Sequence, residues 1–108
     1  MIDKVVDALV KKDSQALAAC FSENCSYIDY CPSLYGRQNL YAHGNIGVQM
    51  ASQRKFLAGE LEVAEPEIEN ENFATFFVSY NGPYIYAGIR IDEYDNCGLI
   101  RRAVVHPV

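Results

Sequence analysis

Asp29 is the first candidate catalytic residue of this sequence, in the role of a base. It lies in the stretch SYIDYCPSLYG, Ser26 to Gly36, between two tyrosines at the end of an alternating segment. Aspartate is a poor strand former and often bonds to nearby backbone at strand ends, so a structural role is the alternative. An apolar pocket mouth would instead raise its pKa toward neutrality, as a general base requires.

His43 is the second candidate catalytic residue. It is one of two histidines, and its spacing from Leu40 would place both on one side of a helix. Imidazole titrates close to neutral pH, which suits it to proton transfer. A core histidine bonded to a carbonyl is the alternative. The other histidine, His106, is interpreted as a terminal strand residue.

Tyr27 and Tyr35 are the candidate ligand-binding residues. Strand alternation places Tyr27 on the face of Asp29, and Tyr35 follows in the next loop. Because tyrosine offers ring contact together with a hydroxyl donor, we expect a small apolar or aromatic ligand. The alternative is that tyrosines cover a sheet or a dimer surface, which fits Tyr84 and Tyr86 better than Tyr27.

Composition narrows the class of protein. A chain of 108 residues, half of them hydrophobic, predicts a single globular domain, residues 1–108. The net charge of −5 and the lack of long Lys/Arg runs argue against nucleic-acid binding. No apolar run approaches the ~20 residues that span a bilayer, and the first residues do not form a signal sequence. We therefore predict no membrane association and a cytoplasmic location.

The cysteines and the paired arginines are interpreted structurally. The four cysteines, at positions 20, 25, 31 and 97, match no metal-binding spacing, so we predict free thiols, no metal and no cofactor. A zinc site from Cys25, Cys31 and His43 lacks that spacing signature. Arg101 and Arg102 fall on opposite faces of the last strand, and pairing with one of the many glutamates is favoured over clamping a ligand carboxylate.

The first half of the chain should form helices around one strand. Apolar residues at helical spacing predict a helix over the first eleven residues, and Asp13 or Ser14 can cap a second helix that ends near Phe21. A strand is predicted over residues 25–30, ended by Pro32. A third helix is predicted over residues 36–52. Its inward side would carry Leu40, His43, Gly47 and Met50.

The second half should form strands. The segments LEVAEPEIE, NFATFFVSY, PYIYAGIRIDEY and GLIRRAVVH are separated by turn residues, with a break expected at Pro66. In the third segment, alternation points Ile85, Ala87, Ile89 and Ile91 inward. It leaves Tyr84, Tyr86, Arg90 and Asp92 outside. The order predicts an α+β fold in which about three N-terminal helices pack on a curved, mainly antiparallel sheet.

This order resembles the nuclear transport factor 2-like superfamily, also called SnoaL-like, which includes ketosteroid isomerase and scytalone dehydratase. The likeness covers nearly the whole chain and is carried by VVDALVKKDSQALAACFSENCSYID, by Gly36 with the helix after it, and by IRIDEYDNCGLIRRAVV. It implies a cystatin-like cone with an internal pocket, Asp29 at the mouth, and a homodimer through the outer sheet face. We assign that dimer face to Tyr84, Tyr86 and Arg90.

In ketosteroid isomerase an aspartate at the end of strand one is the general base, and Asp29 is its counterpart by resemblance. The other two catalytic groups of the isomerase fall near Val5 and between Ile89 and Ile91, where this sequence has no suitable side chain. A steroid isomerase is therefore not expected.

Three functions stay open. The first is a small-molecule pocket protein with isomerase, dehydratase or cyclase chemistry, in which Asp29 is the base and His43 or Tyr27 the donor. The others are a non-catalytic ligand-binding module and a dimeric interaction module of the same fold. A cavity of about 300 Å³ or more would favour the first two.

Overall fold

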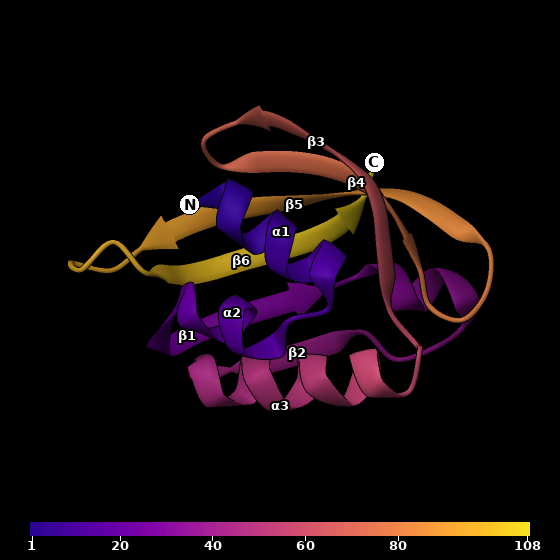
Figure 1. Cartoon of the computed structure of the whole chain (residues 1–108), viewed down its shortest axis with the longest axis horizontal. Helices are drawn as coiled ribbons and strands as arrows, with labels where there is room; N and C mark the ends of the chain where they lie inside the picture. Colours follow the sequence, from indigo (N-terminus) through magenta and orange to yellow (C-terminus); the bar gives the residue numbers. More distant parts are fainter.

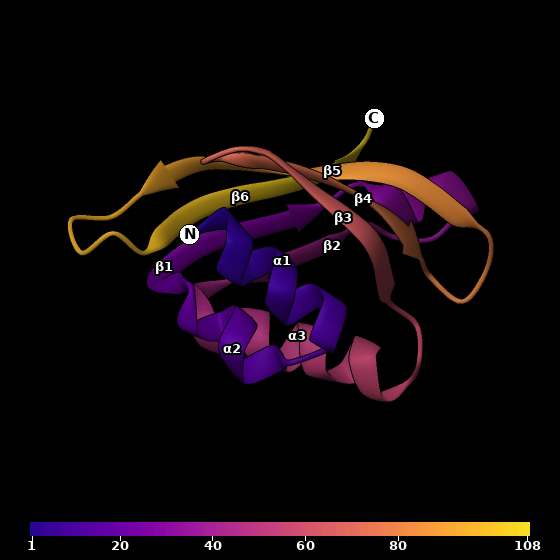
Figure 2. The same cartoon turned by 45° about the horizontal axis from the view of Figure 1, so that its top comes forward.

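Helices cover one face of a single sheet in the computed structural model, which describes all 108 residues, Met1–Val108 (Figures 1 and 2). The helices are α1 (Ile2–Lys11), α2 (Ser14–Ala19) and α3 (Gly44–Leu57), with a 3-10 helix η1 (Cys31–Tyr35). The strands are β1 (Phe21–Asp29), β2 (Leu40–His43), β3 (Glu62–Asn70), β4 (Phe73–Ser79), β5 (Tyr84–Tyr94) and β6 (Ile100–Pro107).

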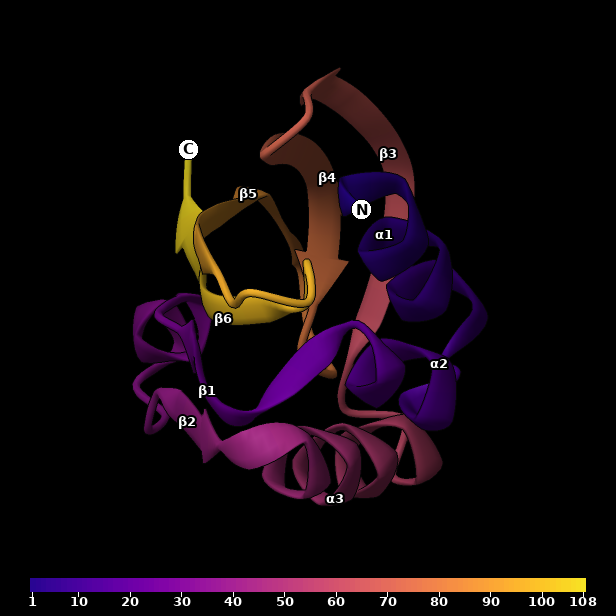
Figure 3. The same ribbon diagram turned by 90° about the vertical axis from the view of Figure 1, so that its left-hand side faces the viewer.

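The sheet is mainly antiparallel, which confirms the predicted fold class. Its six strands run in the order β2-β1-β6-β5-β4-β3, and only β1 and β6 pair in parallel. Seen end on, the sheet is curved, with α1 beside β3 and α3 beside β1 and β2 (Figure 3). No helix combines the length and the apolar character needed to cross a membrane.

The first two helices follow the prediction closely. The buried stripe of α1 includes Val5 and Leu9, and Lys12 ends the helix in a left-handed conformation with φ 56°. Asp13 then caps α2, because its side chain accepts a hydrogen bond of 3.0 Å from the Ala16 N–H. This cap satisfies one of the amide groups that a helix start leaves without a partner.

Strand β1 begins earlier than predicted. The structure ends α2 at Ala19 and places Phe21 in the strand, where its side chain is fully buried. The pairing of β1 with β6 shifts register between Phe21 and Ser26, so regular alternation starts only at the middle of the strand. From there the prediction is confirmed: Cys25, Tyr27 and Asp29 all lie buried on the face toward the helices.

The third predicted helix is present, but it covers residues 44–57 and not 36–52, so its predicted start is wrong. The structure has the end of η1, then strand β2, and helix α3 begins only at Gly44. Two glycines mark these boundaries: Gly36 and Gly44 have φ angles of 72° and 75°, which side chains rarely adopt. The predicted inward side fails as well, since Met50 is 68% exposed and Val48 is buried instead.

The second half of the chain forms the predicted strands. The expected break at Pro66 is a bulge in β3, where pairing with β4 shifts between Ala64 and Glu67 and Glu65 has φ 51°. In β5 the side chains of Ala87, Ile89 and Ile91 are buried, and Tyr84 and Tyr86 are exposed on the outer face, as alternation predicts. The inner face of the sheet and the helices enclose one cluster of 26 buried residues.

Candidate functional site

Asp29 is the last residue of β1 and is almost completely buried, with 3% of its surface exposed. Its Oδ1 accepts a hydrogen bond of 2.9 Å from the Cys31 N–H. Its Oδ2 accepts a hydrogen bond from the hydroxyl of Tyr80. The first bond closes the turn that leads into η1, so the structural role weighed as the alternative is present. Asp29 also has a second, tertiary partner.

Tyr80 is the functional residue that sequence reasoning missed. It follows β4 directly, is 5% exposed, and lies 51 residues from Asp29 along the chain. Arg37 holds it from outside, because Nη1 donates a hydrogen bond of 2.8 Å to the Tyr80 carbonyl. Alternation in NFATFFVSY carried the signal, since Tyr80 continues the inward series of Ala74, Phe76 and Val78.

Burial makes Asp29 the titrating group of this site. Loss of hydration raises its pKa from 3.8 to about 6, while the bonds from Tyr80 and Cys31 oppose that rise. The same burial, reinforced by the Asp29 charge, raises the pKa of the Tyr80 and Tyr27 hydroxyls. Burial also raises the pKa of the Cys31 thiol to about 12. Within this group, therefore, only Asp29 changes its charge near neutral pH.

Asp29 and Tyr80 line a cavity of about 210 Å³. Segments from five parts of the chain form its wall: the end of β1 with the start of η1, the approach to β2, the last turn of α3, the residue before β3, and the residue after β4. The wall residues are Asp29, Pro32, Gln38, Asn39, Leu40, Arg54, Lys55, Leu61 and Tyr80. This volume is below the about 300 Å³ expected of a ligand pocket, so that expectation is not met, and any ligand of this cavity must be small.

The structure does not place His43 in this cavity. His43 ends β2 and pairs with Ser26, so it shares the outer face of the sheet and not the face of Tyr27 and Asp29. Its side chain is exposed. The inward position predicted for His43 assumed a helix that includes this residue. That position is wrong, because α3 begins only at Gly44, the residue after His43.

Tyr27 and Tyr35 lie close to the cavity without lining it. Tyr27 is 4% exposed on the Asp29 face, and its ring meets Phe21 edge to face at a centroid distance of 5.5 Å. Tyr35 lies in η1, where its hydroxyl donates to the Pro83 carbonyl and its ring packs against Tyr80 at 6.0 Å. Both tyrosines support the residues that form the wall.

The remaining sequence candidates have structural partners. Arg102 lies 3.4 Å from the Asp92 carboxylate, which also binds Arg90 at 2.6 Å on the outer sheet face, so Arg102 pairs with an acid, but with an aspartate and not with the predicted glutamate. The four cysteines are free, with only Cys97 exposed. No three histidine, cysteine or acidic side chains group closely enough to hold a metal ion.

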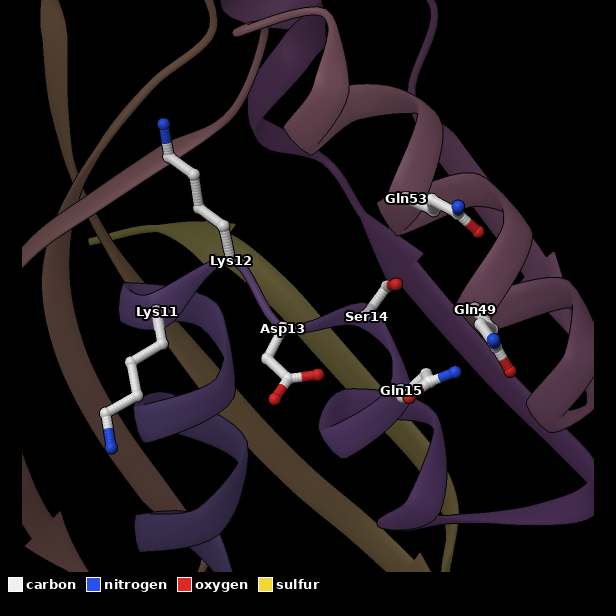
Figure 4. Close-up of a pocket in the computed structure, with 7 residues that line it drawn as sticks. All are labelled: Lys11, Lys12, Asp13, Ser14, Gln15, Gln49 and Gln53. Atoms are coloured by element: carbon white, nitrogen blue, oxygen red, sulfur yellow. The ribbon is translucent and has the colours of Figure 1, made fainter.

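A larger recess of about 440 Å³ lies between the α1–α2 turn and α3 (Figure 4). Its wall is entirely polar and consists of Lys11, Lys12, Asp13, Ser14, Gln15, Gln49 and Gln53. Asp13 already caps α2, and the Lys12 ammonium lies 3.0 Å from Glu62. This recess holds no buried titratable group, so the chemistry points to the smaller cavity at Asp29.

Solved structures match this chain over nearly its whole length. A nuclear transport factor 2-like protein of Cytophaga hutchinsonii is 13% identical with a TM-score of 0.64, covering 99% of this chain and 86% of that one. A SnoaL-like protein of Burkholderia thailandensis is 10% identical with a TM-score of 0.59, covering 98% and 89%. A ketosteroid isomerase-like protein of Catenulispora acidiphila, solved in complex with trimethylamine, is 10% identical with a TM-score of 0.64, covering 97% and 82%.

These matches assign the fold. The chain has the fold shared by nuclear transport factor 2-like, SnoaL-like and ketosteroid isomerase-like proteins, also described as cystatin-like, as the resemblance implied. At these identities the likeness extends to the fold alone. The sequence matches no protein-family model, and comparison with curated proteins finds no match.

Proposed function

We propose that this protein binds a small molecule in the cavity at Asp29 and catalyses proton transfer there, with Asp29 as the base. The observation that carries the proposal is a buried carboxylate whose pKa is raised to about 6 and which lines a cavity that is partly open to solvent. A base with a pKa near the working pH is both deprotonated and able to release its proton again.

The two hydrogen bonds to Asp29 suit this role. Cys31 N–H and Tyr80 O–H each occupy one carboxylate oxygen and fix the carboxylate plane. A carboxylate has about four lone-pair sites, so it can still accept a proton from a substrate carbon or oxygen. Tyr80 donates its hydroxyl to Asp29 itself and stabilises the ionised form of the base, so its role is to position Asp29.

Hydrogen exchange in D2O tests the proposal without a known substrate. The protein is mixed with small ketones and oxo acids, and the loss of C–H signals beside the carbonyl is followed by proton NMR. We expect wild type to catalyse this exchange, and we expect Asp29→Asn to lower the exchange rate by at least about a hundredfold, the scale of general-base catalysis. Asp7→Asn changes an exposed acid on α1 and is the matched control. Equal rates for wild type and Asp29→Asn would reject the catalytic role.

The outer sheet face supports a second function, assembly into a homodimer. Phe77, Tyr84 and Tyr86 are 37%, 53% and 41% exposed there, and the Phe77 and Tyr86 rings lie 5.2 Å apart. Aromatic side chains are enriched in protein interfaces. We propose that this patch, with Arg90 beside it, contacts a second copy of the chain.

The four free cysteines support the proposed cytoplasmic location.

A further inference from the structure

The cavity wall that faces Asp29 carries two cations from the last turn of α3. Lys55 lies 3.2 Å from the Glu60 carboxylate, but Arg54 has no ion pair with any acid of the chain. The charge of Lys55 acts on Asp29, because it helps to lower the pKa of that carboxyl. The cavity therefore combines a buried base with a guanidinium group that has no anionic partner.

A second observation at the same wall indicates a ligand. The side-chain oxygen of Asn39 is buried and has no hydrogen-bond partner. Asn39 lines the cavity together with Arg54. A buried polar atom without a partner costs about 1–3 kcal/mol, so native structures rarely keep one. The carboxylate and carbonyl oxygens of an organic acid are acceptors only, so such a ligand would bind Asn39 through the NH2 group of an amide that has turned over.

The charge around the cavity is unusual for this chain. The whole sequence carries a net charge of −5, yet Arg37, Arg54 and Lys55 gather here against Asp29 and Glu60. Cations in the last turn of a helix also complement its dipole. That effect accounts for a cation anywhere around the turn. Arg54 is exposed, so water can solvate its guanidinium, and the unsatisfied oxygen of Asn39 at the same wall is the feature that the dipole leaves unexplained.

We propose that the ligand is a small carboxylate with a carbonyl group, a short oxo acid. Its carboxylate binds Arg54 and Lys55, and its carbon beside the carbonyl faces Asp29. This inference rests on the proposed function and specifies the substrate class of the same site. A volume of about 210 Å³ lies below the range of sites for drug-sized ligands, which limits the ligand to a small molecule and excludes a polycyclic one.

The chemical step balances without another reactant. The Asp29 carboxylate takes the proton from the carbon beside the carbonyl, and the C–H electron pair forms the enolate. The negative charge that leaves Asp29 thus develops on the substrate, beside Arg54 and Lys55. Return of the proton to another carbon completes an isomerisation, and return of a deuteron to the same carbon gives exchange.

Paired probes of equal size test the substrate class. The probes are oxo acids of three to five carbons such as 2-oxobutanoate, the neutral 2-oxobutanamide, and trimethylammonium chloride as the opposite charge. We expect wild type to bind and exchange 2-oxobutanoate at least about tenfold better than the amide, which corresponds to one charge-assisted hydrogen bond. The proposal is overturned if the protein binds and exchanges the acid and the amide equally well, or if it binds the ammonium probe more tightly than the acid.

Two arginine variants locate the effect. Arg54→Gln should lower kcat/KM for 2-oxobutanoate about tenfold and leave the amide unchanged, because only the acid offers a carboxylate to the guanidinium. Arg101→Gln is the matched control, since Arg101 is exposed and also has no ion pair. Thermal midpoints of both variants should match wild type. Equal effects of the two variants would overturn the proposal.

Binding separates this inference from the proposed catalysis. Ligand-detected NMR measures probe binding whether or not exchange occurs. If Asp29→Asn and wild type show no exchange, but both bind 2-oxobutanoate and Arg54→Gln does not, the carboxylate site stands and the catalytic role falls. If neutral ketones exchange in an Asp29-dependent way while carboxylates do not bind, catalysis stands and the carboxylate site falls.

Discussion

At Asp29, one carboxylate performs two structural tasks and remains able to titrate. Oδ1 closes the turn after β1, and Oδ2 receives the Tyr80 hydroxyl from the far end of β4. Both bonds favour the ionised form, but burial outweighs them and leaves the pKa at about 6. Asp29 therefore combines a structural role at the end of β1 with the ability to take up a proton near neutral pH.

The raised pKa of Asp29 predicts a pH dependence of stability. The folded state holds this proton more tightly than the unfolded chain, whose pKa is 3.8. The contribution to the free energy of unfolding is fully present below pH 3.8 and is lost as pH rises through about 6. It amounts to about 3 kcal/mol at most. The thermal midpoint of Asp29→Asn, measured relative to that of wild type, should therefore be higher at pH 8 than at pH 5.

Tyr80→Phe provides the internal check. It removes a bond that lowers the pKa of Asp29, so the pH midpoint of this stability change should move upward. If Asp29→Asn has the same relative stability at both pH values, the carboxylate is not buried as described.

Much of the residue-scale site was accessible from sequence. Strand alternation placed Tyr27 and Asp29 on one buried face because a period of two is robust within a regular strand. Tyr80 was not identified, because its role depends on a pairing across 51 residues that local pattern does not encode. The same limit applies to Arg54 and Asn39, which only the tertiary fold brings to one cavity.

Among the elements, the segment after β1 shows how glycine decides boundaries. Leu40 to Met50 has a spacing that suits a helix, but Gly44 adopts φ 75° and starts a new direction. A Cβ atom at this position would lie 2.9 Å from the Glu23 carbonyl oxygen. Helical periodicity alone could not reveal this, because the constraint comes from the backbone of β1 and not from the segment itself.

Gly44→Ala should destabilise the fold by about 1–2 kcal/mol or more, since a left-handed conformation and a backbone contact both oppose the new methyl group. Gly47→Ala is the matched control within the same helix, because nothing lies within 4 Å of its added Cβ. That change should stabilise by about 0.5–1 kcal/mol through lower unfolded-state entropy. Urea unfolding measures both. A stabilising Gly44→Ala would contradict the assigned start of α3.

For the whole molecule, the sequence order was sufficient to predict helices on one face of a curved antiparallel sheet. Inner and outer faces of β5 also followed from alternation between Tyr84 and Ile91, because the strand pairs with β4 and β6 without a register shift over that part. The parallel pairing of β1 with β6 could not be predicted from turns between consecutive strands, because these two strands are far apart in the sequence.

The outer patch of Phe77, Tyr84 and Tyr86 predicts a dimer in solution. Tyr86→Glu should shift the protein to monomer, because a charge would be desolvated at the centre of the contact. Tyr41→Glu, at an exposed tyrosine of β2 outside the patch, should leave the dimer intact. Analytical ultracentrifugation over a concentration series gives both results. A wild-type monomer at high micromolar concentration would reject this interface.

The parallel pair of β1 and β6 has a consequence for how the protein is made. Asp29 aligns with Val105, and the Tyr30 N–H donates to the Val105 carbonyl at 2.9 Å. The surroundings of Asp29 are therefore incomplete until β6 has been synthesised and has left the ribosome. Closing so long a loop is slow, typically milliseconds to seconds for sheets rich in distant contacts. Until β6 arrives, the nascent chain exposes an unpaired edge of β1, and this is the stage at which a chaperone would be most useful.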